Sequence, residues 1–542
     1  MLGSTLAKRG WLLVLTAAAC VYLYGLGRAP LVGADEPRYA QVAREMYARG
    51  DLVTPTLGGH TWFEKPALPY WTAAAAYRLF GVTELSARLG TAAAGLLTVL
   101  LLGALAGACE RRAGGELRGL RVTVTGVAAS CAGLLVFSRA LNFDSFITLA
   151  VTGALTCFYL AEMTAEEKAR RWCRAGCYAC VGAGLLSKGL LGVVLPAGVV
   201  ALYYLLRRAR PRGMKTLLWG VPLACAVAGL WYAPVTARHG WTFVDEFFVQ
   251  HHFARYVSNK YHHPQPVYFY LPVMALLALP WTAFLVEALW AARRWRWRGD
   301  DAADGLRVLA LAWLVVPVAF FSLSGSKLPG YVLPALPGAL LLAGERVHAY
   351  LRGDGGRAAM RATGVLLLLS AAGAVGYAAR TGALPLACAA VVAAPAFVLG
   401  VCALFAPERR RLCAWGTVGA ALLTVCLVTM CALAPVARRE SVRDLLRAAA
   451  ARGYGATPVM GLHAVDRTAE FYAAGRLAYD ARGEPFKVDG PGEVWEVARA
   501  RGDVILVFVP LEVLYQLTQA PYLRTEVIGD NGTFALAAVR SN

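Results

Sequence analysis

The sequence predicts an α-helical polytopic membrane protein with about 13 membrane-spanning helices and a small C-terminal α/β soluble domain. Of its 542 residues, 58% are hydrophobic and only 16% are charged, and the mean hydropathy is +0.51. A single soluble core could not bury this much apolar surface. The chain has long apolar segments separated by basic loops, which predicts the membrane-spanning helices. A mixed polar segment after about residue 437 predicts the soluble domain.

Thirteen apolar segments are each long enough, at roughly 17 to 25 residues, to cross about 30 Å of hydrocarbon as a helix. They lie near residues 11–27, 85–108, 121–138, 143–161, 172–187, 189–206, 216–236, 266–292, 306–323, 328–345, 362–379, 383–405 and 413–434.

The net charge of +20, from 54 basic and 34 acidic residues, does not indicate nucleic-acid binding. The basic residues cluster in alternate loops, such as 207–210, 293–296 and 409–411, instead of lying along one face. Basic loops mark the cytoplasmic side of a membrane protein. We therefore expect a retained N-terminal anchor with a cytoplasmic N-terminus, and we expect loops 28–84 and 237–265 and the C-terminus on the outer side.

The predicted domains are a membrane domain over residues 1–436 and an outer α/β domain over residues 437–542. In the second domain, Val442 to Arg452 reads as an amphipathic helix. Three short strands are expected at Val459 to Leu462, Val504 to Val509 and Phe534 to Val539. All 13 cysteines lie in apolar segments or in the predicted cytoplasmic loops, so no disulfide framework is expected.

Several acids precede predicted helices on the outer side. Asp35 and Glu36 stand before an amphipathic helix that is expected from Pro37 to Arg49, and Asp144 follows Asn142 between two apolar segments. Each acid could cap its helix and complement the helix dipole. Alternatively, Asp35 and Asp144 face a site, Asp35 as a base or as a partner for a cationic substrate group.

Four basic residues, Lys65, Lys188, Arg255 and Lys327, stand at outward ends of apolar segments or in the outer loops. Snorkelling into the membrane interface is one explanation for such residues. The other is a shared cationic pocket at the lipid boundary, which suits a phosphate attached to a lipid.

Glu64 and His252 form a candidate metal pair in the two outer loops. A carboxylate and an imidazole can bind zinc, but protein zinc sites usually have three or four protein ligands. A surface histidine without a ligand role is the alternative for His252.

Five motifs, in this order, resemble those of the bacterial 4-amino-4-deoxy-L-arabinose lipid A transferases. The motifs are Asp35-Glu-Pro-Arg-Tyr, Phe63-Glu-Lys-Pro, Ser187-Lys-Gly, His252-x-x-Arg255-Tyr and Lys327-Leu-Pro-x-Tyr331-x-Leu-Pro334. These enzymes group with the protein O-mannosyltransferase-like glycosyltransferases of the GT-C fold, and the resemblance covers roughly residues 10–345. Two departures are His251 before His252, where similar enzymes have an acid, and Ala67 in place of a second proline.

The resemblance implies thirteen spans, a periplasmic C-terminal domain and an undecaprenyl-phosphate-linked sugar donor. It implies that Lys65 and Arg255 hold the donor phosphate, and that Asp35 and Asp144 face the sugar or the acceptor. It also implies that Lys188, Lys327 and Tyr331 line the donor pocket, that Glu36 and Arg38 bind substrate, and that Glu64 and His252 are zinc ligands.

The predicted function is an integral glycosyltransferase of the bacterial inner membrane. We expect it to move a sugar, in the first place 4-amino-4-deoxy-L-arabinose, from undecaprenyl phosphate to lipid A on the periplasmic face. One alternative is transfer of another polyprenyl-phosphate-linked sugar to a protein or cell-envelope glycan. Another is a lipid-carrier transporter or flippase, which would place ionisable groups near the bilayer midplane. The expected partners are the lipid-linked donor, the envelope acceptor and membrane lipids, with no nucleotide and no nucleic acid.

Overall fold

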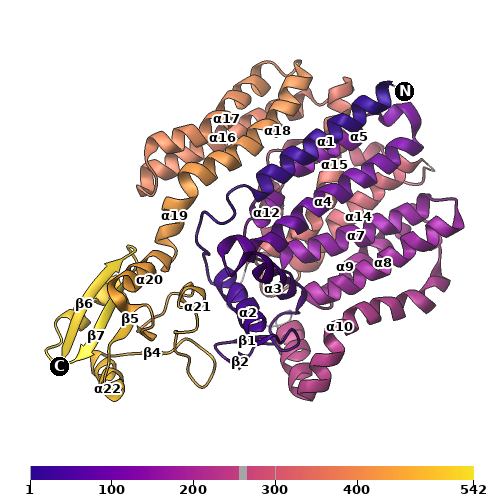
Figure 1. The fold of residues 1–542 in the computed structure, drawn as a ribbon. Helices are drawn as coiled ribbons and strands as arrows, with labels where there is room; N and C mark the ends of the chain where they lie inside the picture. Colours follow the sequence, from indigo (N-terminus) through magenta and orange to yellow (C-terminus); the bar gives the residue numbers. More distant parts are fainter. Residues whose placement is uncertain (1, 255–264, 300) are drawn as a thin grey trace. The chain divides into compact units, whose positions relative to one another are not determined.

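The computed structural model describes residues 2–254, 265–299 and 301–542, and the side chains of residues 2–9, 114, 116 and 251–254 lie outside that description. Most of the described chain is helical (Figure 1). It divides into two compact units, of which the first consists of Met1–Tyr24, Phe63–Pro69 and Arg88–Val428. The second consists of Gly25–Trp62, Tyr70–Ala87 and Thr429–Asn542.

The first unit is a bundle of apolar helices. Its α-helices are α1 (Leu2–Leu23), α4 (Glu84–Arg112), α5 (Leu120–Ala129), α6 (Ala132–Phe137), α7 (Asp144–Met163), α8 (Glu167–Lys188), α9 (Leu191–Arg207), α10 (Leu217–Val244), α12 (Tyr270–Leu277), α13 (Thr282–Ala291), α14 (Ala302–Ser322), α15 (Leu336–Arg352), α16 (Arg357–Thr381), α17 (Leu386–Phe405) and α18 (Arg410–Leu427). Short 3-10 segments lie between them at η1 (Gly114–Leu117), η2 (Met214–Thr216), η4 (Val267–Phe269), η5 (Ala292–Arg294) and η6 (Pro329–Ala335), and the ten-residue π-helix η3 (Asp245–Ala254) follows α10. The pairs α7 and α8, α14 and α15, and α16 and α17 pack side by side (Figure 1).

Seven helices of the described residues are long and apolar enough to cross a membrane, or up to eight if a pair of helices bent by 118° is one span. The seven are Glu84–Arg112, Asp144–Met163, Met214–Gln250, Ala302–Ser322, Arg357–Thr381, Leu386–Phe405 and Arg410–Arg439. Three shorter apolar helices are Gly10–Leu23, Leu120–Ala129 and Leu191–Arg207. The helical membrane class is therefore confirmed, and the number of 13 spans stays a prediction.

Two predicted spans are each broken into two helices. Residues at one break form hydrogen bonds with residues at the other. Residues 121–138 form α5 and α6, while residues 266–292 include α12 and α13, with Pro280 between them. Proline has no N–H with which to continue a helix. The N–H of Ala132 donates to the carbonyl of Leu279 at 2.8 Å, and the indole N–H of Trp281 donates to Ser130 Oγ at 3.0 Å. Backbone groups freed in an apolar bundle need partners of this kind.

The second unit contains the helices and the hairpin of residues 25–62 and 70–87 together with a C-terminal sheet. Its helices are α2 (Asp35–Arg49), α3 (Leu68–Phe80), α19 (Leu433–Arg439), α20 (Arg443–Ala449), α21 (Ala469–Tyr472), α22 (Pro491–Arg501) and α23 (Tyr515–Thr518), with turns η7 (Val428–Ala432), η8 (Ala450–Tyr454) and η9 (Leu511–Val513). Its strands are β1 (Thr56–Leu57), β2 (His60–Thr61), β3 (Val459–Leu462), β4 (Lys487–Val488), β5 (Ile505–Pro510), β6 (Leu523–Asp530) and β7 (Phe534–Ser541).

The five-stranded sheet has the order β4-β3-β5-β7-β6. Strand β3 is parallel to β4 and β5, whereas β7 is antiparallel to β5 and β6. The central strand β5 is buried on both faces, with Leu506 and Phe508 in one apolar cluster and Ile505 and Val507 in another. This explains why its sequence is a continuous apolar run.

The three predicted strands are confirmed as β3, β5 and β7, within two residues at every end. Strands β4 and β6 were not predicted, because β4 has only two residues and β6 is a polar edge strand with several exposed side chains. The predicted helix from Val442 to Arg452 is confirmed as helical, but only its first part is α-helix. Helix α20 ends at Ala449, the chain continues as the π-helical turn η8, and Gly453 interrupts this turn with a positive φ of 92°.

Candidate active site

Asp144 and Lys188 form an ion pair inside the first unit. Asp144 is the first residue of α7 and Lys188 is the last residue of α8, so the packing of these two helices brings the side chains together. The Lys188 Nζ donates to Asp144 Oδ1, and the two side chains are only 14% and 17% exposed. An ammonium group near hydrocarbon is costly unless it is paired. Pairing, and not snorkelling alone, therefore accounts for Lys188.

Asn142 supplies the cap that could have been assigned to Asp144. Its side-chain oxygen accepts the N–H of Ser145 at 2.8 Å, and its amide nitrogen donates to the carbonyl of Phe137 at 2.6 Å. An asparagine before a helix commonly satisfies one of the first N–H groups in this way. The carboxylate of Asp144 is left to bind Lys188.

Tyr331 and Gly330, both in η6, complete the surroundings of this pair. The Lys188 Nζ lies 4.5 Å from the centroid of the Tyr331 ring, a cation–π distance. A Cβ atom at Gly330 would lie 2.5 Å from Asp144 Oδ2, so this position has no room for a side chain. Two motifs that are far apart in the sequence, Ser187-Lys-Gly and Lys327 to Pro334, therefore meet at the Asp144 carboxylate.

Lys327 precedes η6 and is 6% exposed. Its Nζ donates to the carbonyl of Ser324 at 2.6 Å. The hydroxyl of Tyr270 donates to the carbonyl of Leu328 at 3.2 Å, and the rings of Tyr270 and Phe321 lie 6.4 Å apart. The Tyr270 hydrogen bond connects the residue after Lys327 to the start of α12.

Glu64 and Lys65 bind each other in the loop before α3. The Lys65 Nζ donates to Glu64 Oε1 at 2.6 Å, with both side chains less than 15% exposed. Phe63, just before them, packs against His239 and Phe243 at ring distances of 5.0 and 5.3 Å. Among the described residues, no three His, Cys, Asp or Glu side chains come together as a metal-binding group.

Asp35 and Glu36 begin α2 in the second unit, so this helix starts two residues earlier than the predicted Pro37. Asp35 is exposed. Glu36 is 5% exposed, and its Oε2 accepts the N–H of Val32 at 3.1 Å. Glu36 therefore binds the backbone just before α2, which agrees with a structural role. Asp35, in contrast, is exposed to solvent.

Arg38 lies between an acid and an aromatic ring of its own unit. Its Nε donates to Glu470 Oε2 at 3.4 Å, and its guanidinium lies 5.1 Å from the centroid of the Trp62 ring. Glu470 is fully buried and also accepts from Arg467 at 3.0 Å. Burial raises the pKa of Glu470 above its ordinary value, although both arginines oppose this shift.

The structure thus groups Asp144 with Lys188 and Tyr331, and Glu64 with Lys65. Arg255 and the side chain of His252 lie outside the described residues, so the expected cation at Arg255 and the expected imidazole ligand are predictions only. Sequence reasoning missed Gly330, Asn142 and Glu470. Gly330 stands inside the motif from Lys327 to Pro334 and Asn142 lies two residues before the candidate Asp144, whereas Glu470 carries no local signal.

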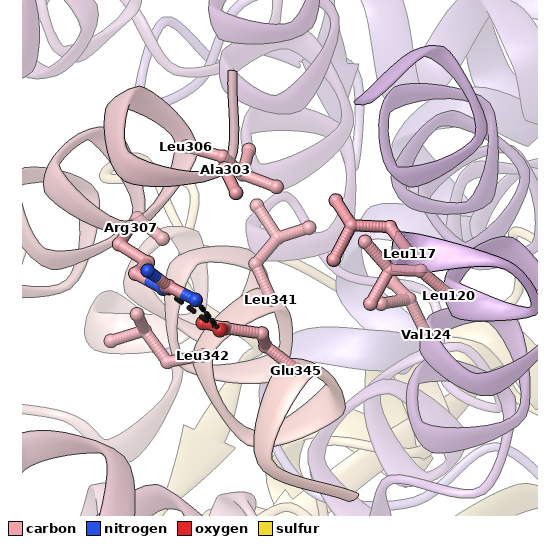
Figure 2. A pocket seen from close by; sticks show the side chains of 10 residues that line it. Leu117, Leu120, Val124, Ala303, Leu306, Arg307, Leu341, Leu342 and Glu345 are labelled. Carbon is pink, nitrogen blue, oxygen red and sulfur yellow. Dashed lines mark hydrogen bonds and ion pairs between the residues drawn. The ribbon is translucent and has the colours of Figure 1, made fainter. Parts of the chain in front are cut away.

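A cavity between η1, α5, α14 and α15 does not resemble a substrate site. Figure 2 shows its apolar lining and the ion pair of Arg307 with Glu345, whose closest atoms are 2.5 Å apart. Its volume is only about 10 Å³, and Asp304 Oδ1 accepts a further hydrogen bond from Arg307 at 2.9 Å. This space holds at most one water molecule, so we assign it to packing.

Known proteins resemble this chain in sequence. Residues 64–234 match the family model described as dolichyl-phosphate-mannose-protein mannosyltransferase. An undecaprenyl phosphate-alpha-4-amino-4-deoxy-L-arabinose arabinosyl transferase of Pseudomonas paraeruginosa is 35% identical over 382 residues, which cover 68% of this chain and 66% of that protein. A protein of the same name from Edwardsiella ictaluri is 33% identical over 372 residues, which cover 66% and 63%. The matched region is slightly less than two thirds of these relatives' length.

The fold also has solved counterparts. The crystal structure of ArnT from Cupriavidus metallidurans bound to undecaprenyl phosphate has a TM-score of 0.78, with 24% identity and 98% of both chains covered. Its apo structure has a TM-score of 0.76. The fold of this chain is therefore that of ArnT, and the resemblance inferred from the motifs is confirmed.

Proposed function

We propose that this chain, a relative of the undecaprenyl phosphate-aminoarabinose arabinosyl transferases, is a membrane glycosyltransferase that moves 4-amino-4-deoxy-L-arabinose from undecaprenyl phosphate to lipid A. The observation that carries the proposal is the Asp144–Lys188 pair beside Tyr331, which brings two separate motifs together at one acidic residue. The names of the relatives support the choice of donor.

In the proposed reaction, an acceptor oxygen forms a bond to the anomeric carbon of the sugar while the bond from that carbon to the lipid phosphate breaks. Negative charge develops on the departing phosphate. Lys188, Lys327, Lys65 and Arg255 are the proposed cations that stabilise it. Asp144 holds the Lys188 ammonium in place through a charge-assisted hydrogen bond.

The proposed role of Asp35 depends on the chemical class of the acceptor. A lipid A phosphate is ionised near neutral pH and needs no general base, so Asp35 would bind the amino group of the sugar or orient the acceptor. A hydroxyl acceptor must lose a proton, and Asp35 is then the proposed base. Its exposure at the start of α2 permits either role. Glu36 and Arg38 would support the same surface of α2.

The proposed topology follows the distribution of basic residues. We place the N-terminus in the cytoplasm, thirteen spans in the bacterial inner membrane, and the loops 28–84 and 237–265 in the periplasm. Residues 437–542 would form the periplasmic α/β domain, with residues 1–436 as the glycosyltransferase domain. The donor then needs no nucleotide, since its sugar is already attached to a membrane lipid.

Zinc at Glu64 and His252 stays a prediction, and no step of the proposed reaction depends on it. Glu64 already binds Lys65, so an ion at Glu64 would compete with the Lys65 ammonium. Metal analysis of the purified chain, before and after dialysis against a chelator, tests this prediction.

The proposal is tested with a panel of substrates in liposomes. The native chain receives undecaprenyl phosphate-linked aminoarabinose, another undecaprenyl phosphate-linked sugar, or a nucleotide sugar, each with lipid A or a peptide acceptor. We expect a lipid A product from the first donor. Transfer only from the second donor would keep the enzyme class and discard the sugar, whereas transfer only from the nucleotide sugar would refute the proposal. Inactivity with every donor would favour a lipid-carrier transporter.

A further inference from the structure

The segment from Trp290 to Gly299 is rich in tryptophan and arginine. It reads Trp-Ala-Ala-Arg-Arg-Trp-Arg-Trp-Arg-Gly and joins the end of α13 to the start of α14. All four of its arginines are exposed, while Trp295 and Trp297 are half-buried. We refer to residues 290–299 as the Trp/Arg segment.

The Trp/Arg segment forms one wall of a cleft of about 910 Å³. Arg296, Trp297, Arg298 and Gly299 line this wall, and Leu205, Leu206 and Arg208 from the end of α9 line the other. No acidic residue is among these lining residues. The cleft therefore combines three positive charges with an apolar surface.

A hydrogen bond from the Arg207 side chain joins the two walls. Arg207 donates to the carbonyl of Gly299 at 2.7 Å, which ties the end of α9 to the Trp/Arg segment. Arg208 follows with a positive φ of 48°, and its N–H donates to the carbonyl of Leu205 at 3.1 Å. Within the described part of the chain, Arg208, Arg296 and Arg298 make no ion pair, so their guanidinium groups are available to an anion.

The cleft lies at the boundary between apolar helices and polar loops. The candidate span α14 begins at Ala302, three residues after Gly299, and Leu205 at the end of α9 is 72% exposed. Tryptophan is enriched at membrane interfaces, where its ring meets both lipid and water. A ligand in this cleft would therefore contact cationic groups with one end and apolar side chains with the other.

This place is distinct from the candidate active site. Lys188 lies just before the start of α9, whereas the cleft is at the far end of that helix. The 17 residues of α9 correspond to roughly 25 Å at 1.5 Å per residue. The same bound lipid could not reach both places with its headgroup.

We propose that the cleft binds the headgroup of an anionic phospholipid. The phosphate would lie between Arg296 and Arg298 on one wall and Arg208 on the other, where guanidinium groups form strong paired hydrogen bonds. An acyl chain would cover Leu205 and Leu206. This site does not depend on the proposed transfer reaction.

Native mass spectrometry of the purified full chain tests the proposal, with phosphatidylglycerol as the probe and phosphatidylcholine as the zwitterionic comparison. The test variant is Arg296→Gln with Arg298→Gln. The matched control is Arg293→Gln with Arg294→Gln, which removes the same charge from the same segment. Arg293 and Arg294 lie over the ring of Trp290, at 3.5 and 5.6 Å, and do not line the cleft.

We expect the native chain and the control to retain phosphatidylglycerol. The test variant should bind this lipid at least about tenfold more weakly. Arg208→Gln, from the opposite wall, should weaken binding in the same direction, which separates loss of the site from misfolding of the segment. Equal weakening in test variant and control would show only diffuse attraction by charge and would overturn the proposal. So would equal binding of phosphatidylcholine, or displacement of the lipid by inorganic phosphate at the same concentration.

Discussion

Lys188 Nζ donates to Asp144 Oδ1 and so joins the C-terminal end of α8 to the N-terminal end of α7. The lysine stands where a helix favours positive charge, and the aspartate where a helix favours negative charge. Because both side chains are largely buried, removal of either would leave the other as an uncompensated charge. A donor phosphate next to Lys188 would enter a site whose cation is already oriented.

Lys188→Met should reduce transfer by about 10²- to 10³-fold, the usual effect of removing one group that stabilises developing charge. The matched control is Arg346→Met, because Arg346 forms a comparably buried ion pair with Glu287 in the same unit. The rate of product formation under saturating donor is the measurement. If both variants lose activity to the same extent, Lys188 contributes only to stability.

Gly330→Ala should impair sugar transfer because it displaces the Asp144 carboxylate. The added Cβ would lie 2.5 Å from Asp144 Oδ2, so the carboxylate or η6 must move. Gly373→Ala is the control, since a Cβ at Gly373 in α16 meets no atom within 4 Å. We expect a loss of at least about tenfold in kcat/KM for Gly330→Ala alone, as misplaced catalytic groups are costly. Unchanged kinetics would remove Asp144 from the proposed site.

Asp35→Asn distinguishes the two classes of acceptor. With a lipid A phosphate as acceptor, kcat should change little, because no proton has to be removed. With a hydroxyl acceptor, kcat should fall by about 10²-fold or more, the usual contribution of a general base. The pH dependence of kcat for the native chain and the variant is the measurement. A pH-independent loss with the phosphate acceptor would instead indicate that Asp35 positions a substrate.

Glu470→Gln should change how stability depends on pH. Burial raises the pKa of Glu470 above its ordinary value of 4.5, in spite of Arg38 and Arg467. A raised pKa in the folded state contributes stability that is complete below the unfolded pKa and is lost as the pH rises through the folded value. The measurement is the difference between the unfolding temperatures of the native chain and of Glu470→Gln. This difference, native minus variant, should therefore fall as the pH rises above about 4.5.

Glu484→Gln is the control for this measurement. Glu484 also binds Arg467, at 2.8 Å, but its side chain is 54% exposed. Its replacement should produce little pH-dependent difference, because water screens an exposed pair. A difference for Glu470→Gln that grows with pH would mean that the arginines outweigh the burial of Glu470.

The membrane class, the apolar helices and the buried strands could be predicted because hydrophobic runs record burial directly. The breaks after Ala129 and before Thr282 could not, since they depend on hydrogen bonds between segments about 150 residues apart, such as that of Trp281 with Ser130. Strand β6 was missed for a related reason. Its pairing with β7 at the sheet edge does not require an apolar sequence.

Part of the candidate site could also be predicted from the sequence. Lys188 and Asp144 each interrupt apolar sequence, which marks them as unusual, but their pairing depends on the packing of α7 against α8. Glu470 lies 432 positions from Arg38 and was invisible to any local pattern. Motifs thus identified individual residues, and tertiary structure decided which of them meet.

The most direct test of the central claim is the mass of lipid A after incubation with undecaprenyl phosphate-linked aminoarabinose in liposomes that contain the native chain, Lys188→Met or Arg346→Met. The account predicts that lipid A gains the mass of one aminoarabinose with the native chain and with Arg346→Met, and gains almost none with Lys188→Met. A full gain with Lys188→Met would contradict the role of the Asp144–Lys188 pair. No gain with the native chain, under conditions in which another lipid-linked sugar is transferred, would contradict the proposed donor.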